Sequence, residues 1–121
     1  MFLILPVGVD YQTRRYPMVT FTLIGINAAV YLISLVCRIV GGEEVTRWIF
    51  DNLWLTPARS PVSAYVTTWF VHGGLFHLLG NMAYLFLFGA CVEDTIGRAK
   101  FVGFYFLGGL AADFLHVLFT P

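Results

Sequence analysis

A histidine and an asparagine four residues apart, His77 and Asn81, form the clearest chemical pattern in the sequence. Residues at i and i+4 of a helix lie on one face about one turn apart, so the imidazole and the amide would point in the same direction. Two fixed N–H donors in a water-poor setting are what an oxyanion hole requires, because they stabilise negative charge on a carbonyl oxygen. The same pair can instead join helices through interhelical hydrogen bonds, and the spacing alone leaves both interpretations open.

Four further polar residues lie within apolar stretches: Asn27, His72, Asp113 and His116. His72 precedes His77 by five residues with two glycines between them, a poor geometry for a shared metal ion, and no cysteine or carboxylate completes a ligand set. We therefore expect neither a metal nor another cofactor. Asp113 and His116, at i and i+3, could relay protons, but an interior hydrogen-bonded pair or a carboxylate near the interface is the favoured interpretation.

These polar residues are informative because most of the chain is apolar. Of its 121 residues, 59% are hydrophobic and only 12% are charged, whereas soluble domains carry about 25% charged residues. A soluble chain this short could not hide so many apolar side chains in a core, but a bilayer could. The net charge of zero provides no electrostatic footprint for nucleic acid, so nucleic-acid binding is excluded. Cys37 and Cys91 are interpreted as small hydrophobic residues.

The charged residues divide the chain into segments long enough to cross a membrane. The uncharged stretches are 16–37, 60–92 and 101–112, and the last of these extends to Thr120 if Asp113 is tolerated within a span. Because about 20 helical residues span a bilayer, and because hydrocarbon leaves backbone groups no partner outside a helix or a closed barrel, we expect transmembrane helices. No period-2 alternation supports a barrel. The sequence thus predicts an all-α polytopic membrane protein with three transmembrane helices, at about 18–38, 75–92 and 101–119.

The connection at about 39–74 is long and rich in aromatic residues. It contains Trp48, Trp54 and Trp69, and tryptophan prefers the headgroup zone of a bilayer. Long connections are usually functional or disordered, and the aromatic content argues against disorder. We expect a partly helical interfacial loop in the outer leaflet.

Positive charge predicts the orientation of the chain. Four basic residues flank the first and third predicted helices on one side: Arg14, Arg15, Arg98 and Lys100. The long loop carries three arginines spread over more residues. Since cytoplasmic segments carry an excess of Lys and Arg, we expect a multi-pass protein with a cytoplasmic N-terminus and an external first loop.

The run TTWFVHGGLFHLLGNM at 67–82, followed by FGACVEDTIG at 88–97, closely resembles the rhomboid family of intramembrane serine proteases. The core of the resemblance is a His-x-x-x-Asn motif closed by a Gly-x-x-x-Glu-x-x-x-Gly pattern at 89, 93 and 97. It covers most of the chain, from Pro17 to Gly109. The resemblance implies that 1–121 is a single, incomplete rhomboid-like domain containing three helices of the family's bundle.

The resemblance also implies roles for individual residues. His77 and Asn81 match the family's side-chain oxyanion donors, and His72 matches a histidine that borders the active-site cavity. Glu93 and Gly97 match a helix-closing turn on the cytoplasmic side, which is a structural role. The family needs no cofactor.

The sequence also departs from the family pattern. The family's nucleophilic serine lies in a Gly-x-Ser-Gly motif of a fourth span, and its base histidine lies in a sixth. The serines of this sequence, at 34, 60 and 63, lack the flanking glycines, and His116 falls in the third predicted helix. Nucleophilic catalysis needs a hydroxyl within reach of a base, so we expect the chain to be inactive alone.

We therefore expect the N-terminal half of a rhomboid-type intramembrane serine endopeptidase that cleaves transmembrane segments of membrane proteins. Its expected partners are the lipid bilayer, a transmembrane-segment substrate and a C-terminal half that carries the Ser/His dyad. The alternative is a non-catalytic rhomboid-like membrane module that binds transmembrane segments. A more distant alternative is a proton or ion carrier that uses His77, Asp113 and His116.

Overall fold

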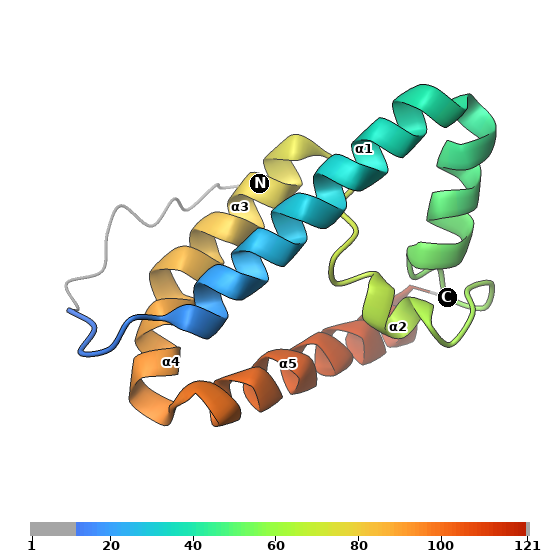
Figure 1. The fold of residues 1–121 in the computed structure, drawn as a ribbon. Coiled ribbons are helices and arrows are strands. Elements are labelled where there is room, and N and C mark those ends of the chain that lie inside the picture. The colour runs from blue at the N-terminus through green and yellow to red at the C-terminus, as the bar shows by residue number, and fades with distance from the viewer. Residues whose placement is uncertain (1–11, 121) are drawn as a thin grey trace.

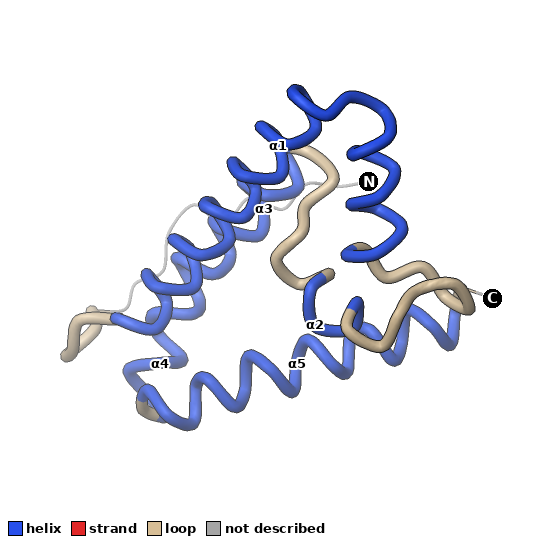
Figure 2. The backbone as a smooth tube through the Cα atoms, turned by 45° about the vertical axis from the view of Figure 1, so that its right-hand side comes forward, coloured by secondary structure: helices blue, strands red, loops and turns tan. Residues whose placement is uncertain are grey.

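The computed structural model describes residues 12–120, which form helices joined by turns and one long loop (Figures 1 and 2). The elements are α1 (Met18–Leu53), α2 (Ala64–Thr67), α3 (Leu75–Tyr84), the π-helical segment η1 (Leu85–Gly89), α4 (Ala90–Ile96) and α5 (Arg98–Phe119). Within residues 12–120 there is no strand, which confirms the predicted all-α class. The backbone stays helical from α3 through η1 to α4, so these three elements form one continuous rod, 75–96.

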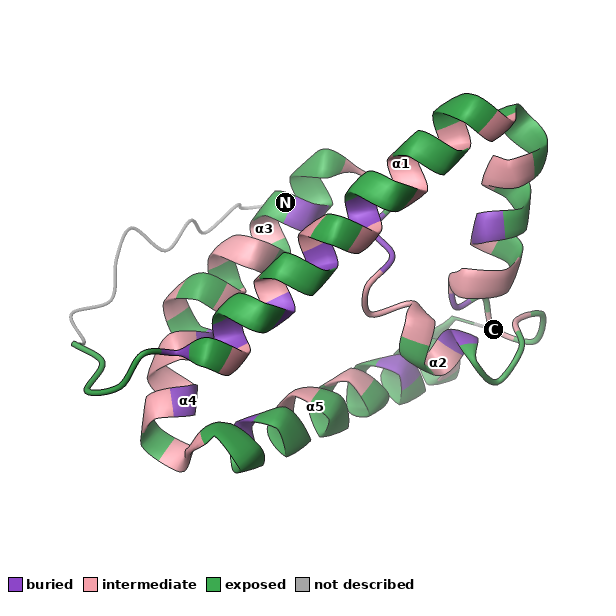
Figure 3. Ribbon diagram, viewed as in Figure 1, coloured by how far each residue is buried: buried purple, intermediate pink, exposed green. Residues whose placement is uncertain are grey.

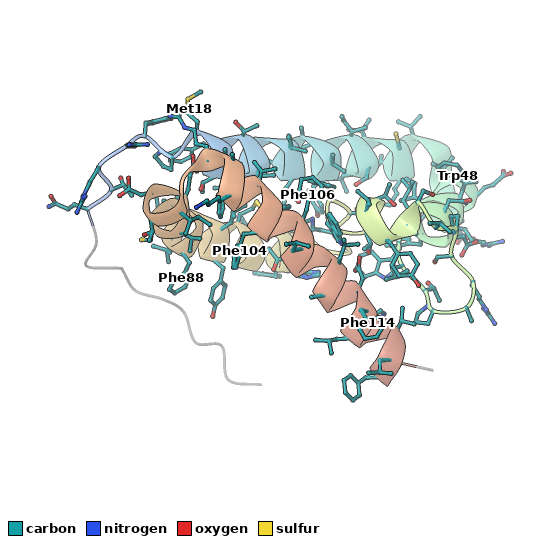
Figure 4. The ribbon with its side chains drawn as sticks, turned by 90° about the horizontal axis from the view of Figure 1, so that it is seen from below. Met18, Trp48, Phe88, Phe104, Phe106 and Phe114 are labelled. Atoms are coloured by element: carbon teal, nitrogen blue, oxygen red, sulfur yellow. The ribbon has the colours of Figure 1, made fainter. Side chains whose placement is uncertain are left out.

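Among the described residues, three helical segments are long and apolar enough to cross a membrane: Met18–Leu53, Leu75–Ile96 and Arg98–Phe119. Much of their surface is exposed, and large apolar side chains project from it (Figure 3). Phe114 of α5, for example, is 67% exposed and points away from the other helices (Figure 4). Such a surface would be unfavourable in water, whereas hydrocarbon solvates it. The chain is an integral membrane protein.

The first helix extends beyond its predicted end at residue 38. It contains a kink at Gly42, whose φ of +65° and ψ of −153° are accessible only to glycine. The part before the kink, from Met18 to Gly41, is about 36 Å long, which suits a bilayer. The remaining part turns back along the molecule (Figure 1), and the Arg38 guanidinium lies 5.7 Å from the centre of the Phe50 ring across the kink.

The second part of α1 and the short helix α2 supply the helical content predicted for the connection 39–74. The loop between them is fixed by side chains: the Thr67 hydroxyl donates to the Leu53 carbonyl, and the Thr68 hydroxyl accepts from the Leu55 N–H. The connection is therefore ordered. Its placement at the membrane interface stays a prediction.

The helices pack closely at one end and diverge at the other. α3 lies beside α1, while α5 turns away from the rod at Gly97 and runs toward α2 (Figures 1 and 2). Gly97 has a φ of +87°, which explains why a glycine ends α4. The second predicted helix therefore ends at 96 rather than 92, and the third begins at 98 rather than 101. The boundary lies at this glycine and not at the charged residues around it.

Candidate active site

His72 is the centre of the candidate site. It lies in the loop before α3 and is only 4% exposed. Its Nδ1 lies 3.3 Å from the carbonyl oxygen of Phe70, which can only accept, and its Nε2 lies 3.1 Å from Nδ2 of Asn81, which can only donate. The two contacts together specify a neutral imidazole with its proton on Nδ1.

His77 and Asn81 lie on one face of α3, and both are exposed. The His77 ring packs edge-on against the His72 ring, with centroids 5.2 Å apart and an angle of 71° between the planes. The three polar residues singled out in the sequence around the second span thus lie together. The His72 to Asn81 hydrogen bond was missed, because it joins a loop to a helix and no helical spacing indicates it.

A cavity of about 430 Å³ adjoins these residues, between the α3–α4 rod and α5. His72 and Asn81 contribute its polar lining, together with Asn27 of α1. Most of the remaining lining is apolar or aromatic, including Phe88 and Phe104. Pockets of this kind, apolar with a few convergent polar groups, are typical of binding sites.

The environment of His72 favours its neutral form. Burial lowers the pKa of the His72 imidazole below its ordinary value, and the nearby His77 lowers it further, while the Phe70 carbonyl acts in the opposite direction. A neutral ring keeps Nε2 free to accept from Asn81. Within residues 12–120, no group of three or more His, Cys, Asp or Glu side chains is placed to hold a metal ion.

The family model for the Rhomboid domain matches residues 59–121, which is more than half of the chain. The chain belongs to the rhomboid family. No curated protein and no solved structure matches it. The matched region includes His72, His77 and Asn81, while Asn27 of the cavity lining lies outside it.

The serines of the rhomboid chain have hydrogen-bond partners other than these histidines, or lie exposed. The Ser34 hydroxyl donates to the carbonyl of Tyr31, and the Ser60 hydroxyl donates to the carbonyl of Trp54. Ser63 lies exposed just before α2. Among residues 12–120, no serine is hydrogen bonded to a histidine, so the described residues contain no hydrogen-bonded Ser/His dyad.

Asp113 and His116 have other hydrogen-bond partners, so of the two interpretations favoured from the sequence, the hydrogen-bonded pair is wrong and the carboxylate near the interface stays a prediction. The Asp113 carboxylate accepts a 2.6 Å hydrogen bond from the Trp69 indole N–H, and His116 lies 3.4 Å from the Thr120 hydroxyl. A buried indole needs an acceptor and an aspartate in a span needs a donor, so residue chemistry gave a signal for this contact. Sequence spacing does not indicate that two residues 44 positions apart would meet.

Glu93 and Asp94 lie in α4, at the end of the rod opposite the histidines, and bind the segment around the start of α1. Glu93 accepts from the backbone N–H groups of Val19 and Thr20 and from the Thr20 hydroxyl, at 2.8–3.0 Å. Asp94 accepts from the backbone N–H groups of Arg14 and Arg15, both at 3.1 Å. We call this arrangement the carboxylate clasp. It satisfies orphan N–H groups at the start of α1, which agrees with the structural role implied for Glu93.

Proposed function

We propose that this chain supplies the oxyanion-stabilising side chains of a rhomboid-type intramembrane serine endopeptidase that cleaves transmembrane segments. The observation that carries the proposal is the placement of His77 and Asn81. Both lie on one exposed face of α3, beside the buried His72 ring, and Asn81 lines the adjoining cavity. Donors arranged in this way can reach a substrate that enters from the membrane side.

The proposed reaction divides the work between this chain and a C-terminal half that carries the nucleophile and base. The seryl oxygen adds to the scissile carbonyl carbon and its proton passes to the base histidine, so the carbonyl oxygen becomes negatively charged. One amide N–H of Asn81 donates to His72, which leaves its second N–H for this oxyanion. A ring N–H of His77 is the other donor.

The intermediate then collapses to an acyl-enzyme. The peptide C–N bond breaks, and the departing amine takes the proton from the base histidine. Water attacks the acyl carbon in the same way and releases the new carboxyl end, and the serine regains its proton. In each addition step the two donors stabilise the same oxygen, so their contribution applies twice per turnover.

His72 is proposed to orient Asn81 rather than to contact substrate. Its Nε2 accepts from one amide N–H and so fixes the rotation of the amide plane. Because burial lowers the pKa of His72, the ring stays neutral and keeps this acceptor near neutral pH.

Replacement of Asn81 tests the proposal most directly. In a chain completed with the C-terminal half of a rhomboid protease, we expect Asn81→Ala to lower kcat by about 10²–10³-fold, the usual loss for one oxyanion donor. Cleavage of a fluorogenic transmembrane peptide in detergent measures the rate. The matched control is Thr95→Ala, an exposed position at the far end of the same rod. An unchanged rate for folded Asn81→Ala would refute the role.

A second candidate function is binding of transmembrane segments without cleavage. The mainly apolar cavity and the absence, within residues 12–120, of a serine bonded to a histidine favour it. Reading the coding sequence past Pro121 separates the two functions. A following Gly-x-Ser-Gly supports the protease, whereas its absence, together with photocrosslinking of a transmembrane peptide to the cavity, supports the binding module.

We also propose that the N-terminus faces the cytoplasm. The clasp brings the Arg14–Arg15 segment against α4, and the Arg98 side chain donates to the Tyr16 carbonyl, so the basic residues at these positions share one end of the molecule. Thr13→Cys and Arg59→Cys, each in a background with both natural cysteines replaced by alanine, test this in intact cells. An impermeant maleimide should label only Arg59→Cys, and labelling of Thr13→Cys alone would reverse the orientation.

A further inference from the structure

We propose that Asp113 is a positioning residue for the candidate site, acting through Trp69 on the loop that carries His72. This inference rests on the proposed function for its catalytic meaning. Its structural part, the coupling of Asp113 to the His72–Asn81 hydrogen bond, can be measured on the chain by itself. We call residues 68–74 the His72 loop.

The contact between Asp113 and Trp69 is short and partly shielded. The distance from Trp69 Nε1 to Asp113 Oδ2 is 2.6 Å, and Asp113 is only 6% exposed. A hydrogen bond to a carboxylate is stronger than one between neutral groups. It is especially valuable in a membrane-spanning helix, where a carboxylate without a partner is costly.

The face of α5 next to Asp113 is shaped to receive the Trp69 ring. A methyl group added at Gly109 would lie 2.6–2.9 Å from three atoms of the indole, so only glycine leaves room for the ring. One turn earlier, Phe106 meets the indole edge-on, with ring centroids 5.4 Å apart. Asp113, Gly109 and Phe106 follow helical spacing and together form a seat for the indole.

The seated indole restrains the His72 loop from one side. Trp69 is followed by Phe70, whose carbonyl accepts from Nδ1 of His72, and the other ring nitrogen of His72 accepts from Asn81. A continuous series of contacts therefore runs from Asp113 through Trp69 and the Phe70 carbonyl to His72 and Asn81. Displacing the indole should move the Phe70 carbonyl and release the fixed His72 tautomer.

The first experiment reads the His72 tautomer by nitrogen-15 NMR of histidine-labelled chain in detergent micelles, with His72→Gln used for assignment. In the unaltered chain we expect the proton on Nδ1. Gly109→Ala should force the indole out of its seat and shift the signal toward a mixture of tautomers. Gly103→Ala is the matched control, because Gly103 lies on the same helix away from the cavity lining, and a methyl group there meets nothing within 4 Å.

A second pair of variants tests whether the hydrogen bond accepted by residue 113, apart from the packing of the indole, holds the His72 tautomer. Asp113→Asn keeps an oxygen that accepts from Trp69 and should retain the Nδ1-protonated form, whereas Asp113→Leu should lose it. If Asp113→Leu does not fold, Trp69→Phe removes the same hydrogen bond while keeping a ring in the seat. An unchanged His72 spectrum in both Gly109→Ala and Trp69→Phe overturns the inference.

The catalytic part is tested in the completed protease. A displacement of about 1 Å at a positioned group can cost on the order of 10²-fold in rate, so Gly109→Ala should lower kcat by up to about that factor with little change in KM. Gly103→Ala, outside the cavity lining, should match the unaltered enzyme. If Asn81→Ala leaves the rate intact while Gly109→Ala still alters the His72 tautomer, the proposed function fails and the positioning role stands.

Discussion

The α3–α4 rod has two ends that treat their polar groups in opposite ways. At the Gly97 end, the carboxylates of Glu93 and Asp94 are fully engaged. They accept hydrogen bonds from the Thr20 hydroxyl and from the backbone N–H groups of Arg14, Arg15, Val19 and Thr20. At the opposite end, His77 and Asn81 are exposed beside a cavity, and only part of their hydrogen-bonding capacity is used.

The difference shows which polar residues stabilise the fold and which are available for chemistry. Glu93 and Thr20 are buried and saturated, so neither has a group left to offer a substrate. His77 and Asn81 lie on an open face, so they add little to the fold and keep free donors. A polar residue of a membrane-spanning helix can therefore contact substrate only where it retains such free capacity.

The largest effect should come from opening the clasp at Glu93. Glu93→Ala leaves the N–H groups of Val19 and Thr20 and the Thr20 hydroxyl without their acceptor, and each buried unsatisfied group costs about 1–3 kcal/mol. We expect a loss of about 3 kcal/mol or more, seen as a thermal midpoint roughly 10 °C lower in detergent. Glu44→Ala is the control, because Glu44 is exposed. A midpoint equal to that control would show that the clasp does not stabilise the fold.

The next effect concerns His77, at the exposed end of the rod, where a substitution should lower activity strongly and stability only slightly. His77→Ala removes an exposed ring, so the free energy of unfolding should fall by no more than about 1 kcal/mol, with a correspondingly small drop in the thermal midpoint. In the completed protease the same change should lower kcat by about 10²-fold. Measuring both quantities on one preparation distinguishes a donor from helix packing. A large drop in midpoint with normal activity per folded molecule would assign His77 to packing.

The helices could be predicted because their determinants are local. Uncharged stretches of sufficient length indicated three spans, and the i, i+4 spacing placed His77 and Asn81 on one face of α3. The sequence predicts an end of the first span at about 38, because the uncharged stretch ends at Cys37. Helical hydrogen bonding continues past the charged residues that follow, and Gly42 produces a kink instead of an end.

The contacts that complete the candidate site could not be predicted in this way. The bond from Asn81 to His72 and the bond from Trp69 to Asp113 join a loop to two different helices. Their formation depends on the path of the His72 loop and on the space at Gly109, which are tertiary properties. Residue chemistry restricts the partners of a buried aspartate or histidine, but it does not choose among them.

A smaller effect is expected at the outer part of the clasp. The Asp94 side chain holds the backbone of Arg14 and Arg15 in a more exposed setting, so Asp94→Ala should cost only about 1 kcal/mol. It should also free the segment before α1 for proteolysis. Brief trypsin treatment followed by mass spectrometry should show faster cleavage after Arg14 and Arg15 than in the unaltered chain. Equal cleavage rates would mean that Asp94 does not restrain this segment.

The smallest effect should be the pH dependence contributed by His72. Burial lowers the pKa of its imidazole in the folded chain from the ordinary value of 6.5, so the unfolded chain binds the proton more tightly. Stability from this residue is therefore fully present above about pH 6.5, declines as the pH falls below that value, and levels off below the folded pKa. Thermal midpoints in detergent between pH 8 and pH 5, on the order of three pH units, cover this window. His72→Gln should flatten the decline, whereas His116→Gln, at an exposed position, should retain it. If His72→Gln kept the full slope, protonation of another group would have to account for it, and the buried neutral ring would lose its place as the fixed acceptor for Asn81.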